Sequence, residues 1–172
     1  MKISKMIPTK PGKQTLKCLV ILSGNSSTGK SGVLRMLGDL LREESLYWFK
    51  QKGRVESHDM RMSCRFNRLT IGIGTAGDSE EIAKQNLAFF NEQKCVVGIL
   101  AANVNAGVDA WIRTHSKLAP YQIAVIEKKD VQSKFAREAI QILYVDAIYR
   151  SFLKSGSIRT IVKSVKTETR GV

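Results

Sequence analysis

Short apolar runs alternate along this chain with longer segments in which apolar residues recur every three or four positions. The short runs are typical of buried strands, and the periodic segments are typical of amphipathic helices. Strands are predicted at 17–23, 45–51, 68–78, 94–104, 121–129 and 157–165. Helices are predicted at 30–44, 78–93, 106–118 and 130–154. The polar segment 53–67 fits either a strand or an exposed loop.

The alternation predicts an α/β fold. Strands that are separated by helices favour crossover connections, which produce a mostly parallel sheet with helices on both faces, a three-layer sandwich. The length of 172 residues suits one domain with a substantial core and is short for two. We expect a single domain over residues 17–165, a basic N-terminal extension at 1–16 and a basic C-terminal tail at 166–172.

The formal charge of +13 is concentrated at the two ends of the chain. Residues 1–17 carry five lysines and no acidic residue, and residues 148–172 carry six basic residues and one glutamate. Such ends attract polyanions, nucleic acid included, or they serve solubility in general, and both interpretations stay open. The sequence contains no pattern of a helix-turn-helix, a zinc finger or an RNA-binding module, so it does not support base-specific reading of nucleic acid.

The three cysteines are widely spaced, at positions 18, 64 and 95. Their odd number and spacing favour buried reduced thiols over a disulfide framework or a zinc site, which points to the cytoplasm. No apolar run approaches the roughly 18 residues of a membrane span, and the basic N-terminus lacks the apolar centre of a secretory signal.

The stretch GNSSTGKS at 24–31 carries the clearest chemical signal. The pattern G-x-x-x-x-G-K-[ST] is matched by Gly24, Gly29, Lys30 and Ser31, between a predicted strand and a predicted helix. Glycines let backbone N–H groups curl around phosphate oxygens, and the start of the helix adds its positive end. The lysine of this pattern reaches the outer phosphates, and the hydroxyl of its last residue binds Mg²⁺.

On this motif, residues 17–153 resemble the P-loop NTPase superfamily. The resemblance implies that a nucleoside triphosphate, ATP or GTP, binds with Mg²⁺. The implied phosphate-binding residues are Gly24, Asn25, Ser26, Ser27, Thr28, Gly29, Lys30, Ser31 and Gly32.

A second motif, Gly74-Thr75-Ala76-Gly77-Asp78, resembles the D-T-A-G-Q turn of Ras-like small GTPases. In that family the Asp helps to hold Mg²⁺ through water, and the Gln orients the attacking water. Here Gly74 replaces the Asp, and Asp78 stands at the position of the Gln. We therefore take Asp78 as a catalytic or Mg²⁺-binding candidate, although it could equally cap the following helix.

Two other carboxylates compete for the metal role. Asp59 lies in the ambiguous segment 53–67, which could fold back over the phosphates. Glu127 ends the apolar run QIAVIE. The resemblance implies that the strand ending before Asp78 lies beside the first strand, and that the strand of Glu127 lies farther from the loop.

A third motif, EKKD at 127–130, resembles the N-K-x-D guanine-recognition motif of the same family. Lys128 and Asp130 match, and Glu127 stands in place of the Asn. The resemblance implies that Lys128 packs over the base and that Asp130 accepts hydrogen bonds from its edge. Alternatively, Asp130 is the N-cap of the last helix.

Together these motifs predict a slow Mg²⁺-dependent NTPase, with Lys30 and Asp78 as its catalytic candidates. A P-loop nucleoside, nucleotide or small-molecule kinase is the first alternative, with 53–67 as acceptor site and 106–118 as lid. The second alternative is a non-enzymatic nucleotide-binding protein that acts on nucleic acid or in an assembly. A homo-oligomer or a protein partner stays open.

Overall fold

The structure, a computed structural model, describes residues 16–44, 49–52, 60–66, 69–116, 121–128, 130–131 and 133–153. The strands are β1 (Cys18–Gly24), β2 (Phe49–Lys52), β3 (Arg61–Phe66), β4 (Leu69–Gly74), β5 (Val97–Asn103) and β6 (Gln122–Glu127). The helices are α1 (Lys30–Glu44), α2 (Glu80–Glu92), α3 (Val108–Ser116) and α4 (Lys134–Leu153). The predicted strand at 157–165, the tail at 166–172 and nearly all of the N-terminal extension lie outside the described residues.

The described strands form one sheet in the order β2-β3-β4-β5-β1-β6. Strands β4, β5, β1 and β6 run parallel to one another, and β2 and β3 continue the sheet as antiparallel strands beside β4. The sequence leaves the segment 53–67 open between strand and loop, and the part of it that the structure describes, residues 60–66, is mostly strand. A mostly parallel sheet was predicted, and it is confirmed.

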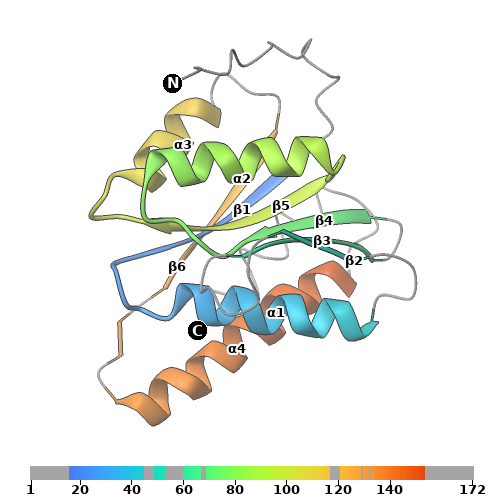
Figure 1. The fold of residues 1–172 in the computed structure, drawn as a ribbon. Helices are drawn as coiled ribbons and strands as arrows, with labels where there is room; N and C mark the ends of the chain where they lie inside the picture. The colour runs from blue at the N-terminus through green and yellow to red at the C-terminus, as the bar shows by residue number, and fades with distance from the viewer. Residues whose placement is uncertain are drawn as a thin grey trace, which may run out of the picture.

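Helices cover both faces of the sheet, which gives the predicted three layers (Figure 1). Helices α1 and α4 pack against each other on one face, and α2 and α3 pack on the other. No helix in the described parts of the chain is long and apolar enough to cross a membrane.

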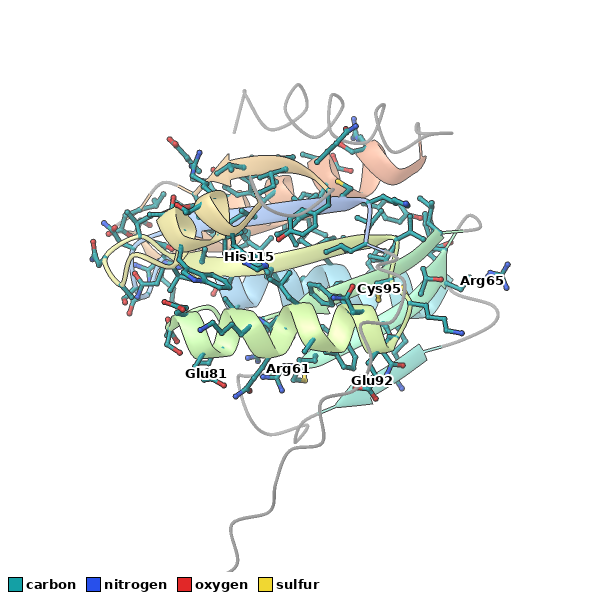
Figure 2. The ribbon with its side chains drawn as sticks, turned by 90° about the horizontal axis from the view of Figure 1, so that it is seen from above. Arg61, Arg65, Glu81, Glu92, Cys95 and His115 are labelled. Atoms are coloured by element: carbon teal, nitrogen blue, oxygen red, sulfur yellow. The ribbon has the colours of Figure 1, made fainter. Side chains whose placement is uncertain are left out.

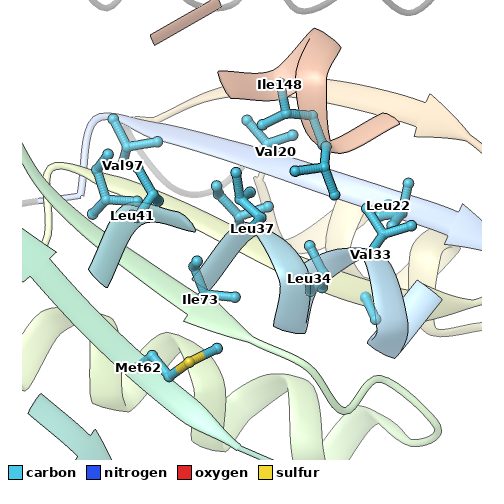
Figure 3. Packing of buried hydrophobic residues seen from close by; sticks show 14 of the residues in the cluster. Val20, Leu22, Val33, Leu34, Leu37, Leu41, Met62, Ile73, Val97 and Ile148 are labelled. Carbon is cyan, nitrogen blue, oxygen red and sulfur yellow. The ribbon is translucent and has the colours of Figure 1, made fainter. Parts of the chain in front are cut away.

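The core on the α1 face is built from the predicted apolar stripe of α1. Val33, Leu34, Leu37 and Leu41 are fully buried and pack against the inner residues of β1 and β5 (Figure 3). This burial is the main source of stability for such a helix, because side chains of this size each contribute about 1.5–3 kcal/mol when removed from water. The opposite face has its own core, which includes Leu16, the last residue of the predicted extension.

The order of the parallel strands corrects two expectations. Strand β5 lies between β4 and β1, so the strand that ends before Asp78 is not beside the first strand. Strand β6 pairs directly with β1, so Glu127 lies closer to the loop than expected, opposite Ser23. The burial of the strands explains this order. Strands β1 and β5 are buried along their whole length and take central places, whereas β6 is exposed at both ends and takes the edge.

All three cysteines are buried and free, as predicted. Burial raises the pKa of the Cys18 and Cys95 thiols to about 12, so both are protonated at neutral pH. The cysteines therefore act as small apolar side chains of the core.

Candidate functional site

The 24–31 loop connects the carboxyl end of β1 to the start of α1. Ser27 and Gly29 adopt positive φ angles of 61° and 82°, so the backbone curls tightly before the helix begins at Lys30. Gly24 is required by close packing, because a Cβ there would lie 2.9 Å from the Lys128 carbonyl oxygen. A curled segment at the start of a 15-residue helix presents N–H groups and the positive end of the helix to the same point.

All the loop residues singled out in the sequence lie in this turn or in the first turn of α1: Gly24, Asn25, Ser26, Ser27, Thr28, Gly29, Lys30, Ser31 and Gly32.

The Lys30 ammonium lies inside the loop. The residue is 7% exposed, and Nζ donates to the Gly24 carbonyl at 2.9 Å and to the Asn25 carbonyl. Burial lowers the pKa of Lys30, and the nearby negative charge of Asp78 acts in the opposite direction. The loop carbonyls thus hold a partly desolvated cation next to the curled backbone.

Asn103 ties the loop to the end of β5. Its side-chain Nδ2 donates to Ser26 Oγ at 2.9 Å, and the next amide, Val104 N, donates to the Gly24 carbonyl at 3.3 Å. Asn103 is 6% exposed. We did not select this residue from the sequence, although a polar residue that ends a buried parallel strand is a signal for the ligand edge of a sheet.

The turn after β4 reaches the loop by crossing the end of β5. A Cβ on Gly77 would overlap the Ala101 carbonyl, so glycine permits the crossing at this point. The Gly77 carbonyl accepts a hydrogen bond of 2.9 Å from Asn103 N. Although β4 and β1 are not neighbours, this crossing brings Asp78 to the same edge as Lys30.

Thr75 fixes this turn to its surroundings. Its carbonyl accepts a hydrogen bond of 2.9 Å from Ser31 Oγ, in the first turn of α1. Its hydroxyl accepts one of 2.8 Å from Met60 N, and its own amide donates to the Met60 carbonyl at 3.0 Å. The fully buried Thr75 therefore joins three segments of the chain. Asp59 precedes Met60 in the sequence and lies outside the described residues.

Asp78 is exposed and does not cap α2. The N-cap is Ser79, whose hydroxyl accepts from Ile82 N at 3.3 Å. The predicted alternative role of Asp78 as the cap of α2 is therefore wrong.

The Ser31 hydroxyl and the Asp78 carboxylate are the side chains at this edge that could contribute to an Mg²⁺ site. In the described part of the chain, no three His, Cys, Asp or Glu side chains converge on one point. Such a cluster is not needed, because nucleotide-bound Mg²⁺ takes most of its ligands from phosphates and water and one or two from protein. Ser31 is hydrogen-bonded to the 75–78 turn, and Asp78 is part of it. Their hydroxyl and carboxylate are oxygen ligands that such a metal could use.

Lys128 lies at the end of β6, on the other side of the loop. Its backbone amide donates to the Ser23 carbonyl at 2.7 Å, and its side chain packs under α4. The residue is 4% exposed, and among the described residues no atom accepts a hydrogen bond from Nζ. The ammonium lies 5.7 Å from the centre of the Tyr144 ring.

Among the described residues, two of the three charged groups that act on Lys128 are positive and disfavour its protonated form. Burial lowers the pKa of Lys128, and the positive charges of Arg137 and Lys30 lower this pKa further, whereas Asp130 raises it. Asp130 is exposed and does not cap α4, because the Ser133 hydroxyl accepts from Ala136 N at that position.

A pocket of about 430 Å³ opens beside the first half of the loop. Its lining combines the loop, the end of β6 and α3: Ser23, Gly24, Asn25, Thr28, Val104, Asp109, Glu127, Lys128 and Asp130. Asp109 is the acidic member from α3, and it accepts from Ser23 Oγ at 3.3 Å and from Arg113 Nε at 3.4 Å. The pocket is thus rich in hydrogen-bond acceptors next to the candidate phosphate loop.

Helix α4 lies over the helical end of the loop. Gln141 Nε2 donates to the Gly29 carbonyl at 3.4 Å, and Arg137 Cδ lies 3.8 Å from the position of a Cβ on Gly29. The Arg137 guanidinium donates to the Val131 carbonyl at 3.0 and 3.3 Å. We did not predict these α4 residues, and no local signal identifies them, since more than 100 positions separate them from the loop.

Two polar side chains, Arg61 and His115, make their contacts on the face of the sheet that α2 and α3 cover, and not with the loop. Arg61 donates to Asn86 Oδ1 at 2.9 Å and to Gln85 Oε1 at 2.6 Å, and His115 stacks on Trp111 at 5.0 Å (Figure 2). Trp111 itself packs against the core. These contacts hold Arg61 against α2 and His115 against Trp111.

Comparisons with models of protein families, with curated proteins and with solved structures yielded no significant match.

Proposed function

We propose that the chain binds the phosphates of a nucleoside triphosphate in the 24–31 loop and hydrolyses the nucleotide slowly with Mg²⁺. The observation that carries the proposal is the Lys30 ammonium, which is buried inside a backbone curl between a buried strand and a helix start. An anion at this point gains the lysine charge, the loop N–H groups and the helix end together. The motif, which resembles that of the P-loop NTPase superfamily, agrees with this geometry.

In this proposal each neighbouring segment has one task. Lys30 leaves the loop carbonyls to bind the outer phosphates, and Asn103 holds Ser26 and with it the loop. Ser31 and Asp78 hold Mg²⁺ on the β4 side. The metal, when bound, neutralises charge that develops on the phosphates during transfer.

The turnover should be slow. Phosphoryl transfer depends mainly on positioning and charge stabilisation, and fast sites contain a group that orients the attacking water. Asp78 is the described side chain that occupies the position of that group in the related turn. A single exposed carboxylate orients water less tightly than a buried network does.

Phosphoryl transfer to a small molecule is the second candidate. The pocket beside the loop favours it, because Asp109 and Glu127 line a space of about 430 Å³ that could accept a hydroxyl-bearing acceptor. Product analysis separates the two reactions, since hydrolysis releases inorganic phosphate and a kinase reaction labels an added acceptor.

Calorimetry of the full chain with ATP and with GTP, each with and without Mg²⁺, tests the proposal. The Lys30→Ala variant should lose at least about a hundredfold in affinity, since charge-assisted contacts to two or more phosphate oxygens are removed. Lys84→Ala is the matched control, because Lys84 is a half-exposed lysine on α2 that pairs with Glu80. Equal affinities of the wild type and the Lys30→Ala variant would contradict the proposal.

A further inference from the structure

Among the described residues, the Lys128 ammonium beside the loop has no hydrogen-bond acceptor. A buried charge without a hydrogen-bond partner is unfavourable, and proteins keep such groups chiefly where a ligand pairs with them. The π face of Tyr144 offers a weak substitute for a hydrogen bond at 5.7 Å. Folding alone therefore does not explain a lysine at this position.

Three cations from distant parts of the chain lie around the 24–31 loop, near enough for the charges of Lys30 and Arg137 to act on Lys128. Lys30 comes from the loop, Lys128 from the end of β6 and Arg137 from α4. Lys128 and Arg137 approach the two ends of the loop, since the Cβ of Lys128 lies 3.7 Å from the position of a Cβ on Gly24, and Arg137 Cδ lies 3.8 Å from the position of a Cβ on Gly29. The carboxylates that act on these cations, Asp78 on Lys30 and Asp130 on Lys128, are exposed. Like charges this close are costly until an anion arrives among them.

We propose that Lys128 and Arg137 form a second cationic wall of the phosphate site, with Lys128 on the phosphate chain and Arg137 on the outermost phosphate. This inference rests on the proposed function. It assigns Lys128 to the phosphates in place of the base-packing role that the EKKD motif suggested. It also makes α4 the element that distinguishes a triphosphate from a diphosphate.

The position of α4 supports the assignment of Arg137. The helix lies over Gly29, next to Lys30, which reaches the outer phosphates, whereas the open pocket lies at the Gly24 end of the loop. The Arg137 guanidinium now donates to one neutral carbonyl, that of Val131. Exchange of this carbonyl for a phosphate oxygen replaces a neutral hydrogen bond with a charge-assisted, two-pronged one, which is the stronger interaction.

The experiment compares three kinds of anion on the full chain. The affinities of ATP and GTP, of ADP and GDP, and of inorganic tripolyphosphate are measured by calorimetry in the wild type and in three variants. Lys128→Met replaces the buried ammonium with an apolar side chain of similar length, and Arg137→Gln removes the guanidinium. Arg150→Gln is the control, because Arg150 lies on the same helix and pairs with Asp146 on the surface.

We expect Lys128→Met to weaken tripolyphosphate and nucleotides alike, by about tenfold or more, as loss of one charge-assisted contact predicts. Arg137→Gln should weaken triphosphates by about tenfold and leave diphosphates within about twofold. Arg150→Gln should change neither. Thermal unfolding confirms that each variant folds, and Lys128→Gln replaces Lys128→Met if the latter does not.

Several results would overturn the inference. Tripolyphosphate binding that survives Lys128→Met while nucleotide binding falls would assign Lys128 to the base. Equal losses for diphosphates and triphosphates in Arg137→Gln, or none, would remove α4 from the outer phosphate. If Lys30→Ala abolishes binding and these variants do not weaken it, the second wall alone is refuted. If Lys30→Ala also binds normally, the proposed function fails with it.

Discussion

The two sides of the 24–31 loop are built in opposite ways. On the β4 side, Thr75 is fully buried, and its amide, hydroxyl and carbonyl all take part in hydrogen bonds that join the turn to α1 and β3. On the β6 side, Lys128 is almost as deeply buried, but its ammonium has no hydrogen-bond acceptor among the described residues.

This difference suggests different tasks for the two sides: the β4 side holds the segments around the loop in place, and the β6 side offers a charge to an anion. A satisfied buried network holds its segment in one place, and here it sets the location of Ser31 and Asp78. An unsatisfied buried charge adds nothing to the stability of the chain alone, and it gains its partner when an anion binds.

The largest effect should come from Gly77→Ala, which breaks the β4 side. A Cβ there overlaps the Ala101 backbone, so the turn must move away from the end of β5. We expect the free energy of unfolding to fall by about 3 kcal/mol, as for severe overpacking, together with weaker Mg²⁺ dependence as Asp78 shifts. Denaturant unfolding measures the first effect, and nucleotide titration with Mg²⁺ measures the second.

Gly107→Ala is the control for backbone conformation. Gly107 has a φ of 68°, and a Cβ there meets no atom within 4 Å. The free energy of unfolding of Gly107→Ala should fall by only about 1 kcal/mol, which is the strain of a non-glycine residue in the left-handed region. Gly77 does not share this positive φ, so a loss in Gly77→Ala no larger than that in Gly107→Ala would contradict the clash with the β5 backbone.

A smaller effect should come from Asp78→Asn, which keeps the turn and removes its charge. Nucleotide binding should persist within a few fold, and Mg²⁺-dependent turnover should fall by about tenfold to a hundredfold, or roughly 2 kcal/mol in the barrier. Phosphate release under saturating nucleotide measures this change. Glu81→Gln, an exposed acid in the first turn of α2, is the matched control.

If Asp59→Asn lowers the turnover and Asp78→Asn does not, the metal-side carboxylate is Asp59. The β4 side would then position a backbone segment without supplying the charge.

The smallest effect concerns stability on the β6 side. Because no described residue accepts a hydrogen bond from the buried Lys128 ammonium, the free energy of unfolding of Lys128→Met at neutral pH should be about 1 kcal/mol higher than that of the wild type. The gain should shrink toward alkaline pH. The folded pKa of Lys128 lies below the ordinary 10.5, mainly through burial. Between these two values the folded chain releases a proton that the unfolded chain keeps, so the wild type gains stability as the pH rises.

Urea unfolding of both proteins from pH 7 to pH 10.5 checks this prediction, and the difference between them isolates Lys128 from the other lysines. A Met variant that is less stable at pH 7 would mean that the contact with Tyr144 outweighs the burial of the charge. The contrast between the two sides of the loop would then disappear.

Much of the fold could be predicted from local patterns. The apolar stripe of α1 and the fully buried runs of β1 and β5 depend on neighbouring residues in the sequence, so their periodicity identifies them. Helix starts were less accurate. Helix α4 begins at Lys134 where 130 was predicted, because Ser133, and not Asp130, supplies the capping hydroxyl.

The candidate site was predicted in part. The 24–31 loop is a local motif, and its curl between β1 and α1 agrees with the predicted strand and helix. The neighbours of the loop are not local. Asn103 reaches it because β5 pairs with β1, and Gln141 reaches it because α4 packs on α1.

The sequence by itself determined the type of each layer and the position of the loop, because hydrophobic period and glycine placement act over a few residues. Tertiary structure alone decided which strand lies beside which, and with it the placement of β5 between β4 and β1 and of β6 beside β1. Several strands of similar apolar character could have paired with β1. The choice among them depends on the burial of whole faces, to which residues far apart in the chain contribute together. The pairing of β6 with β1 also placed Lys128 beside Gly24.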